Sequence, residues 1–135
     1  MNSLTLAAKD DNLDRVLAFV DEQLKKMNCP TKTQAQIDIA VEELFVNIAH
    51  YAYDTGTGNA TIQLEPENDN ALTITFIDSG VPYDPLKKPD PDITLSAEER
   101  QIGGLGIYMV KKSMDDISYE YRDGQNVLKI KKLIG

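Results

Sequence analysis

The chain has 135 residues, of which 41% are hydrophobic, and it carries a formal net charge of −8. This length suits one domain with a single core, residues 1–135. The acidic balance argues against binding to a nucleic-acid backbone, which requires basic residues gathered on one face. We therefore expect a protein as the macromolecular partner, and an anionic ligand would need backbone amides, a metal ion or a few local cations.

Two further features restrict the class of protein. The sequence has neither a run of about 18 apolar residues nor the basic and apolar segments of a signal peptide, so no membrane contact and a cytoplasmic location are expected. The single cysteine, Cys29, has no partner for an internal disulfide or a CxxC pair. A reducing compartment and a structural role for Cys29 are expected.

The first part of the chain predicts one strand and two helices. Residues 3–8 favour a short strand, and the helical spacing of apolar residues predicts a helix over 13–27, capped by one of the polar residues at 10–12. A second helix should run from about Thr33, which opens a capping box, to about Tyr53, where a Gly-rich stretch stops it.

The rest of the chain predicts two hairpins separated by a long excursion. Strands over 60–65 and 71–78 form the first hairpin, and strands over 117–121 and 126–133 form the second. The Pro-rich, charged segment 83–102 exceeds the usual loop length of about 12 to 15 residues, which is typical of a lid or binding segment. A third helix follows directly behind glycines. This order predicts an α+β two-layer sandwich with a mixed, mainly antiparallel sheet and helices on one face.

The second predicted helix carries polar residues inside an apolar run, VEELFVNIAHYAY at 41–53. Glu43 and Asn47, one turn apart, lie together at the edge of the apolar stripe, whereas Glu42 points about 100° away. A carboxylate and an amide oxygen in this arrangement can hold Mg²⁺ and orient a water or hydroxyl. The alternative is that the two side chains satisfy each other or a loop backbone. The apolar stripe consists of Ile37, Val41, Leu44 and Ile48.

The second motif is LTITFIDSGVPYDP, in which alternation places Asp78 on the same strand face as Leu72, Ile74 and Phe76. A carboxylate in line with buried residues needs a donor, because an unpaired buried charge is costly. Gly80 permits an unusual backbone conformation or the close approach of a flat ligand. Asp78 could therefore read the exocyclic amine of a purine. The alternative is an ordinary Asp-Ser-Gly turn.

The third motif is the Gly103-Gly104-Leu105-Gly106 segment that opens the third helix. Free amides and the positive end of the helix dipole make such a segment a natural cradle for phosphate. It is not a P-loop, since no Lys-Ser or Lys-Thr follows. It is also a poor dinucleotide fingerprint, because Met109 takes the place of the last glycine.

In this order and spacing, VEELFVNIAHYAY, DSGVPYDP and GGLGIYMV resemble the N, G1 and G2 boxes of the GHKL (histidine-kinase-like) ATPase superfamily, whose domain is the Bergerat ATP-binding fold. The sequence is most similar to the short RsbW-type anti-sigma factor serine-protein kinases. The resemblance covers nearly the whole chain, and three ordered boxes make a specific match.

The resemblance implies ATP and Mg²⁺ as ligands and assigns roles to four residues of the first two boxes. Glu43 would be the general base that activates the attacking hydroxyl or water, and Asn47 would bind the Mg²⁺ that bridges the phosphates. Asp78 would accept a hydrogen bond from the adenine amine, and Gly80 would line the base pocket.

In the third box, the resemblance implies that the backbone amides of Gly104, Leu105 and Gly106 bind the phosphates. Residues 85–102 would form the ATP lid. Three lid cations are candidate phosphate contacts, with a solvated charged loop as the alternative: Lys87, Lys88 and Arg100.

Two positions depart from the family pattern. Many relatives carry a histidine four residues after the asparagine of the first box, where this chain has Tyr51 and the preceding residue is His50. We expect His50 to be a structural or edge residue. Relatives also often have a threonine near the adenine in the last strand, where this chain offers Gln125 or Asn126.

The resemblance implies a kinase that phosphorylates a serine of a small STAS-domain (anti-anti-sigma) protein, and that otherwise sequesters a sigma factor, usually as a homodimer. The first helix, including Arg15, would offer a partner surface, with a solvated arginine as the alternative. Two other readings remain open. One is a non-catalytic module whose partner binding is gated by nucleotide, and the other is the catalytic domain of a histidine kinase. The latter fits less well, because the only histidine lies inside the helix of the first box.

Overall fold

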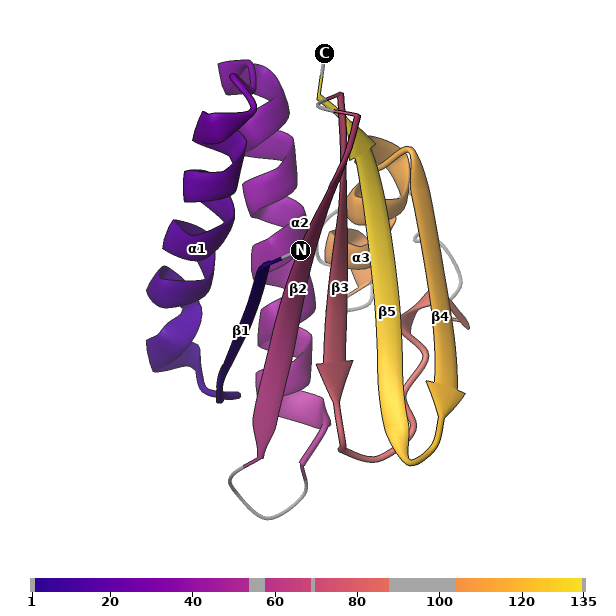
Figure 1. The fold of residues 1–135 in the computed structure, drawn as a ribbon. Helices are drawn as coiled ribbons and strands as arrows, with labels where there is room; N and C mark the ends of the chain where they lie inside the picture. Colours follow the sequence, from indigo (N-terminus) through magenta and orange to yellow (C-terminus); the bar gives the residue numbers. More distant parts are fainter. Residues whose placement is uncertain (1, 54–57, 69, 88–103, 135) are drawn as a thin grey trace.

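The computed structural model describes residues 2–53, 58–68, 70–87 and 104–134. Within these ranges the chain forms one five-stranded sheet with three α-helices packed against one of its faces (Figure 1). The predicted α+β two-layer sandwich with helices on one face is confirmed.

All neighbouring strands of the sheet pair antiparallel, in the order β1-β2-β3-β5-β4, which confirms a mainly antiparallel sheet. Both predicted hairpins are present, β2 with β3 and β4 with β5. The second hairpin turns at Asp123 and Gly124, whose φ angles of 55° and 78° suit a two-residue turn. The strands are β1 Asn2–Ala7, β2 Asn59–Glu67, β3 Ala71–Asp78, β4 Asp116–Arg122 and β5 Gln125–Leu133.

The helices are α1 Leu13–Lys26, α2 Thr31–Tyr51 and α3 Gly104–Ser113, with short 3-10 turns at Asp10–Asn12 and Pro85–Lys87. The middle helix, α2, packs between α1 and α3 and runs along the sheet (Figure 1). The sheet-facing side of α2 is therefore flanked by the other two helices.

The predicted ends of α2 were wrong by two residues each. The helix begins at Thr31, because Pro30 takes the N-cap position in an extended conformation and no side chain caps the helix. The capping box at Thr33 therefore does not form. The helix ends at Tyr51, because hydrogen bonds hold the side chain of Tyr53 against other segments. The Tyr53 hydroxyl donates to the Asn59 carbonyl (2.7 Å) and accepts the Ser79 N–H (3.0 Å).

The N-terminus of α1 also uses its polar residue differently from the prediction. Asn12 is the N-cap, but its side chain makes no cap hydrogen bond. Instead its Nδ2 donates to the Ala7 carbonyl (2.8 Å) and so ties the start of α1 to the end of β1.

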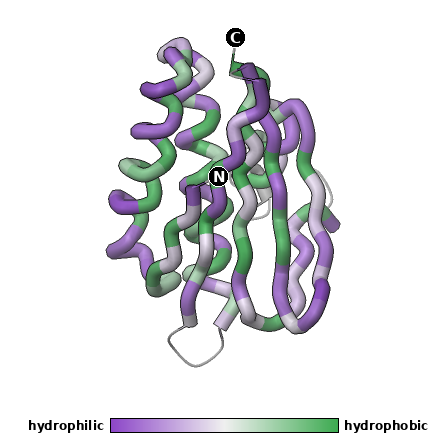
Figure 2. Tube along the Cα trace, viewed as in Figure 1, coloured by the Kyte–Doolittle hydropathy of each residue, from purple (hydrophilic) through white to green (hydrophobic). Residues whose placement is uncertain are grey.

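Alternation along the strands separates a buried face from a solvated one, as Figure 2 shows in the changing colours along the strands. The helix-facing side supplies large buried residues, whereas the opposite side carries threonines, lysines and glutamates such as the Glu67–Lys131 ion pair (2.8 Å). The core is formed by these inward residues and the apolar stripes of the helices. Its largest members are Phe45, Phe76, Leu24, Ile37, Ile62, Leu64, Leu72, Ile74, Ile107 and Ile130.

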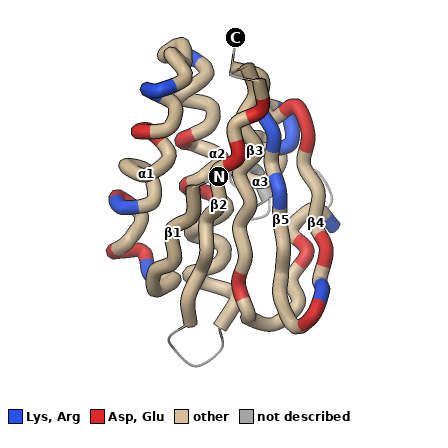
Figure 3. Tube along the Cα trace, in the orientation of Figure 1, with Lys and Arg blue, Asp and Glu red and all other residues tan. Residues whose placement is uncertain are grey.

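The predicted stripe of the second helix is confirmed, since Ile37, Val41 and Leu44 are buried and Ile48 is half-buried. In Figure 3 the basic residues are spread over several elements and form no single basic face among the elements drawn. No helix in the described ranges combines the length and the apolar character needed to cross a membrane.

Candidate functional site

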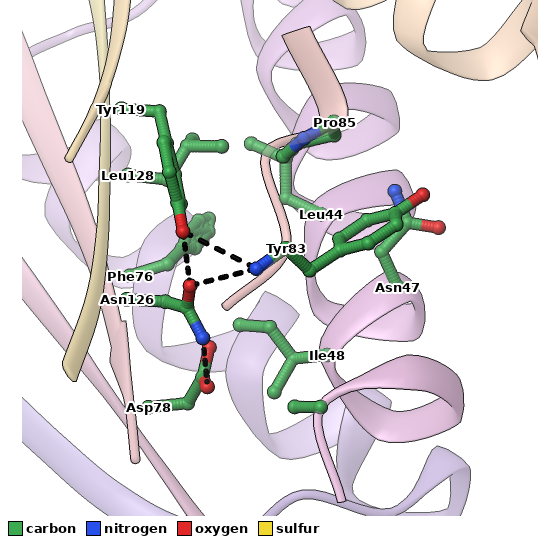
Figure 4. A pocket seen from close by; sticks show the side chains of 11 residues that line it. Leu44, Asn47, Ile48, Phe76, Asp78, Tyr83, Pro85, Tyr119, Asn126 and Leu128 are labelled. Atoms are coloured by element: carbon green, nitrogen blue, oxygen red, sulfur yellow. Dashed lines mark hydrogen bonds between the residues drawn. The ribbon is translucent and has the colours of Figure 1, made fainter. Parts of the chain in front are cut away.

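A small pocket opens between α2 and the sheet, beside the end of β3 (Figure 4). Its walls are mostly apolar, and its polar groups come from α2, β3, β4 and β5. Such a pocket suits a flat, largely apolar ring that presents a few polar atoms. The lining residues are Leu44, Asn47, Ile48, Ala52, Phe76, Asp78, Tyr83, Pro85, Tyr119, Asn126 and Leu128.

Asp78 lies at the inner end of this pocket, where the alternation of β3 places it on the buried face with Phe76. Only 5% of the residue is exposed. Its Oδ1 accepts two hydrogen bonds, from the Gly80 N–H (2.9 Å) and from Asn126 Nδ2 (2.9 Å). The hydrogen bond from Gly80 belongs to an Asp-Ser-Gly turn. Asp78 therefore forms this turn and also lines the pocket, so the two alternatives for this motif are both present.

Asn126 stands opposite Asp78 in the register of β3 and β5. Besides Asp78, its Nδ2 donates to the Val81 carbonyl (2.8 Å), and its Oδ1 accepts from the Tyr83 N–H (3.1 Å) and the Tyr119 hydroxyl. Of the two candidates in the last strand, Asn126 is therefore the residue at the pocket, whereas Gln125 is exposed.

Tyr119 is a pocket residue that the sequence reasoning missed. Its side chain points inward from β4, and its hydroxyl also accepts the Tyr83 N–H (3.3 Å). Burial, followed by the nearby charges of Asp84 and Asp78, raises the pKa of Tyr119 despite an opposing effect of the Tyr83 N–H, so the hydroxyl stays protonated and able to donate. An available signal was its position on the inward face of an edge strand, since a buried tyrosine hydroxyl usually finds a partner.

Tyr83 and Tyr51 form an aromatic pair at the side of the pocket, with ring centroids 5.6 Å apart and planes 24° apart. This contact links the last turn of α2 to the segment that follows β3. His50 lies elsewhere: it is exposed and its Nε2 lies 2.8 Å from Asp10 Oδ2. It thus holds the edge position expected for it.

A second part of the site lies further along α2, toward α3. Glu43 is half-buried and Glu42 is exposed, as the helical geometry predicts. A Cβ added to Gly106 would overlap the Glu43 carboxyl group, so the first turn of α3 lies directly against this carboxylate. Asn47 lines the pocket one turn later, and its buried Nδ2 has no hydrogen-bond partner among the described residues. Glu43 therefore does not satisfy that nitrogen.

The remaining predicted residues fall in three groups. Gly80 is absent from the pocket lining. A Cβ at Gly80 would overlap the Ala52 carbonyl, which also accepts the Val81 N–H (2.8 Å). The close contact of the Gly80 backbone is therefore with the end of α2. Gly104 and Leu105 belong to the first turn of α3, and Lys87 is exposed at the end of its 3-10 turn. The predicted contacts at Lys88 and Arg100, Gly103 and lid residues 88–102 lie outside the described residues.

Two predictions away from the pocket concern the surface and the thiol. Arg15 is exposed on α1, as a partner-facing or merely solvated residue would be. Cys29 is half-buried and packs against the core. Burial, and then the charges of Asp38 and Asp21, raise the pKa of its thiol, which agrees with a structural role.

Comparison with known proteins identifies the family. Residues 6–132 match the family model described as Histidine kinase-like ATPase domain. The chain belongs to this family, which confirms the resemblance carried by the three motifs.

Two curated relatives define the nearer neighbourhood. Serine-protein kinase RsbW of Bacillus cereus (strain ATCC 10987) is 35% identical over 97 residues, which cover 69% of this chain and 60% of that protein. Serine/threonine-protein kinase BtrW of Bordetella bronchiseptica is 27% identical over 92 residues, which cover 68% of this chain and 65% of that protein. The match thus spans less than two thirds of either relative.

Two solved structures share the fold. The RsbU and RsbW domains of Rv1364c from Mycobacterium tuberculosis align with 99% of this chain and 33% of that one, at a TM-score of 0.64 and 16% identity. The histidine kinase domain of a blue-light activated kinase from Erythrobacter litoralis aligns with 78% of this chain and 46% of that one, at a TM-score of 0.57 and 16% identity. These alignments support the two-layer fold.

Proposed function

We propose that this protein is a cytoplasmic, ATP-binding regulatory serine-protein kinase that phosphorylates a STAS-domain anti-anti-sigma protein. One observation carries the proposal: a buried carboxylate, Asp78, ends an apolar pocket whose α2 wall continues, through Asn47 and Glu43, to the first turn of α3. A base, a metal-bound phosphate chain and an attacking hydroxyl would fit along this line in that order.

The pocket end of this line suits adenine. Leu44, Ile48 and Phe76 offer apolar walls to a flat ring, and Asp78 offers a carboxylate oxygen to an exocyclic amine. A carboxylate accepts hydrogen bonds but donates none, so this contact favours a base with an amine at that position.

The other end suits phosphates. The N-terminus of α3 presents the backbone amides of Gly104, Leu105 and Gly106, with the positive end of the helix dipole behind them. In the part of the chain that the structure describes, no three His, Cys, Asp or Glu side chains are grouped so that they could hold a metal ion. In phosphate sites Mg²⁺ usually keeps several waters and binds the substrate phosphates, so it would need as little as one side-chain ligand here.

Asn47 fits this single ligand position. Its Nδ2 is buried and has no hydrogen-bond partner in the described residues. A flip of the side-chain amide would therefore break no hydrogen bond of that nitrogen and would place Oδ1 where Nδ2 now lies. When bound, Mg²⁺ would offset the phosphate charge.

Glu43 is proposed as the general base of the transfer. It would accept the proton of the seryl hydroxyl as the seryl oxygen bonds to the γ-phosphorus and the bond between that phosphorus and the ADP oxygen breaks. Contact with Gly106 holds the carboxylate beside the N-terminal turn of α3, where the γ-phosphate would lie.

The names of the relatives support a protein substrate. RsbW and BtrW are serine and serine/threonine-protein kinases by name, and one solved neighbour holds RsbU and RsbW domains together. We propose a STAS-domain protein as the phosphorylated partner, a sigma factor as the alternative partner, and a homodimer as the working form. The exposed face of α1 around Arg15 is the proposed partner surface.

The first test is calorimetric titration of ATP, with and without Mg²⁺, into wild type and Asp78→Asn. Micromolar binding by wild type that tightens with Mg²⁺ is expected. Asp78→Asn should weaken it about tenfold or more, because a hydrogen bond to a charged group contributes roughly 1.5 to 3 kcal/mol. Absence of binding by wild type would overturn the proposal.

The second test measures transfer of the labelled phosphate from γ-labelled ATP to STAS-domain proteins whose genes lie next to the gene for this protein. Labelling of one of them on serine supports the kinase. If ATP changed the affinity for such a partner while no label was transferred, the non-catalytic, nucleotide-gated module would replace it.

A further inference from the structure

The pocket between α2 and the sheet is small for the flat ring that its walls suit. Its volume is about 40 Å³, which is room for about three water molecules. A protein cavity that admits a single benzene ring measures about 150 Å³, and pockets for small-molecule ligands usually measure about 300 Å³ or more. A purine can therefore enter this pocket only if part of its wall moves.

The walls of the pocket differ in how firmly the fold holds them. The helix α2 and the sheet contribute core residues, such as Leu44 (3% exposed) and Phe76 (2% exposed), which cannot move without disturbing a close-packed core. Another wall is the segment that follows β3, residues 81–87, which contributes Tyr83 and Pro85. We call this segment the strap. The strap is the part of the wall that lies outside the regular elements of the core.

The beginning of the strap is anchored to both layers of the fold. The Val81 N–H donates to the Ala52 carbonyl at the end of α2 (2.8 Å). The Val81 carbonyl accepts a hydrogen bond from Asn126 Nδ2 on β5 (2.8 Å). A movement of the strap would therefore begin beyond Val81.

The far part of the strap holds itself together. Among the described residues, the N–H groups of Leu86 and Lys87 both donate to Asp84, at 2.9 Å to its Oδ1 and at 3.3 Å to its carbonyl oxygen. Neither bond reaches outside the strap, so residues 84–87 keep these bonds when they move. The closed position of this part depends on the apolar contact of Pro85 and on Tyr83.

Tyr83 holds the strap through its backbone and through its ring. Its N–H is shared between Asn126 Oδ1 (3.1 Å) and the Tyr119 hydroxyl (3.3 Å), so both bonds depend on one hydrogen. Its ring stacks on the ring of Tyr51 in the last turn of α2. Figure 4 shows Tyr83 between the strand residues and the helix. Tyr83 therefore ties the strap to the sheet on one side and to α2 on the other.

Tyr51 takes part in this closure from outside the pocket. It is 51% exposed, it is the last residue of α2, and it is absent from the pocket lining. Loss of its ring would remove no part of the wall that a ligand touches. Any effect of Tyr51 on a ligand in the pocket must therefore pass through the strap.

The closed form also hides the residue proposed for the metal ion. Asn47 lines the same pocket as Tyr83, one turn before Tyr51 on α2, and its Nδ2 is buried. An ion can reach the place of that atom only after the covering groups have moved. The base end and the metal position thus both require an opening of the pocket.

We propose that the contact between the rings of Tyr51 and Tyr83 is an autoinhibitory latch: it holds the strap against the pocket in the nucleotide-free protein, and the strap must move away beyond Val81 before a purine enters. The inference rests on the proposed nucleotide site and adds to it a step that controls entry. Tyr51 acts in this step as a positioning residue.

A latch residue and a contact residue have effects of opposite sign. Because only the open form binds, the apparent dissociation constant equals the intrinsic one divided by the open fraction. Tyr51→Ala removes the stacked pair and increases the open fraction, so it should bind nucleotide faster and more tightly. The gain should be about twofold to tenfold, the range expected for one aromatic pair. The dissociation rate should stay close to that of wild type, because the bound form lacks the latch.

The test is stopped-flow association of ATP that carries a fluorescent N-methylanthraniloyl group on its ribose, measured with Mg²⁺ on wild type and Tyr51→Ala. Tyr51→Phe keeps the stacked ring and should associate at the wild-type rate. Tyr121→Ala is the matched control, because it removes the ring of a tyrosine that is 45% exposed and outside the pocket lining. Its association rate should also equal that of wild type.

Amide hydrogen exchange of the nucleotide-free protein gives a second readout that needs no ligand. In Tyr51→Ala the Tyr83 N–H should exchange about twofold to tenfold faster than in wild type, because the strap opens more often. The Val81 N–H, which donates to the Ala52 carbonyl at the anchored end, should exchange at the wild-type rate. The two amides thus distinguish opening of the strap from general loosening of this part of the fold.

The outcomes separate the latch from the proposed function. If wild type binds the labelled ATP and Tyr51→Ala associates at the same rate or more slowly, the latch is overturned while the nucleotide site stands. Unchanged exchange of the Tyr83 N–H in Tyr51→Ala would also overturn it. If wild type binds no nucleotide, the proposed function fails and the latch fails with it. Faster association and faster Tyr83 exchange in Tyr51→Ala, reproduced by neither Tyr51→Phe nor Tyr121→Ala, support the latch.

Discussion

The two ends of the candidate site are built on different principles. At the Asp78 end, Asn126, Tyr119 and the backbone after β3 satisfy one another, and one carboxylate oxygen is left for a ligand. At the Glu43 end, the buried Asn47 Nδ2 has no partner in the described residues. The first end is therefore preorganised by the protein, whereas the second has a polar group that a ligand would have to satisfy.

The difference follows from the elements involved. Asp78 and Asn126 are opposite each other in two central, paired strands, so backbone hydrogen bonds fix their relative position. Glu43 and Gly106 belong to two separate helices, α2 and α3, which no strand pairing holds in register. We expect substitutions at the strand end to change which ligand binds, and substitutions at the helix end to change what happens to it.

Glu43→Gln should have the largest effect and sharpen this division. An amide keeps the size of the side chain but cannot accept the seryl proton, so phosphate transfer should fall about a hundredfold or more. ATP affinity should change by less than about threefold, because the strand end is intact. Single-turnover transfer from γ-labelled ATP measures the rate, and the exposed neighbour provides the control variant Glu42→Gln. Transfer at the wild-type rate would remove Glu43 from the chemistry.

A pair of glycine substitutions probes the same division through packing. Gly106→Ala places a methyl group on the Glu43 carboxyl, which is the movable end of a side chain, whereas Gly80→Ala places one on the Ala52 backbone carbonyl. Gly106→Ala should therefore fold normally and slow transfer about tenfold. Gly80→Ala should cost about 1 to 3 kcal/mol of stability by overpacking. Thermal unfolding and transfer assays measure both, and equal loss of stability in the two variants would contradict the expectation.

A contact between α1 and α2, away from the pocket, also contains buried polar atoms without a hydrogen-bond partner in the described residues, and here they do not indicate a ligand. Asp21 on α1 and Asp38 on α2 each bury one carboxyl oxygen without a hydrogen-bond partner among the described residues. Burial, then a hydrogen bond with Asp21 and its charge, raise the pKa of Asp38 to about 7. We interpret this pair as a proton-sharing contact between two helices.

The pH dependence of stability should reveal this contact, with the smallest effect of the three. Because the pKa of Asp38 is higher in the folded than in the unfolded state, its contribution to stability is complete at low pH and is lost as pH rises toward and through about 7. Between about pH 5 and about pH 8, the melting temperature of Asp38→Asn should therefore fall a few degrees less than that of wild type. Parallel curves for the two proteins would contradict the shared proton.

Much of the fold was predictable because its signals are local. Alternation gave both hairpins and the buried face of β3, and helical spacing gave the stripe of α2 and the choice of Glu43 over Glu42. The ends of α2 were missed because they depend on contacts from outside the helix. Pro30 begins it in place of Thr33, and the bonds of Tyr53 to the strands end it.

The candidate site divides in the same way. Asp78, Asn47 and Glu43 stand out in sequence because polar residues break apolar patterns, and this signal needs no knowledge of their neighbours in space. Gly80 was also singled out, but its neighbour proved to be the Ala52 carbonyl. Tyr119 was missed, since a tyrosine on the apolar face of a strand looks like any core residue.

The sequence by itself determined the family, the order of the elements and the faces on which the polar residues lie, because periodicity and spacing are properties of neighbouring residues. The tertiary structure alone decided that Asn126, 48 residues from Asp78, rather than Gln125 completes the base end. That choice depends on the register between β3 and β5, and a shift of one residue would turn every side chain of β5 to the other face of the sheet.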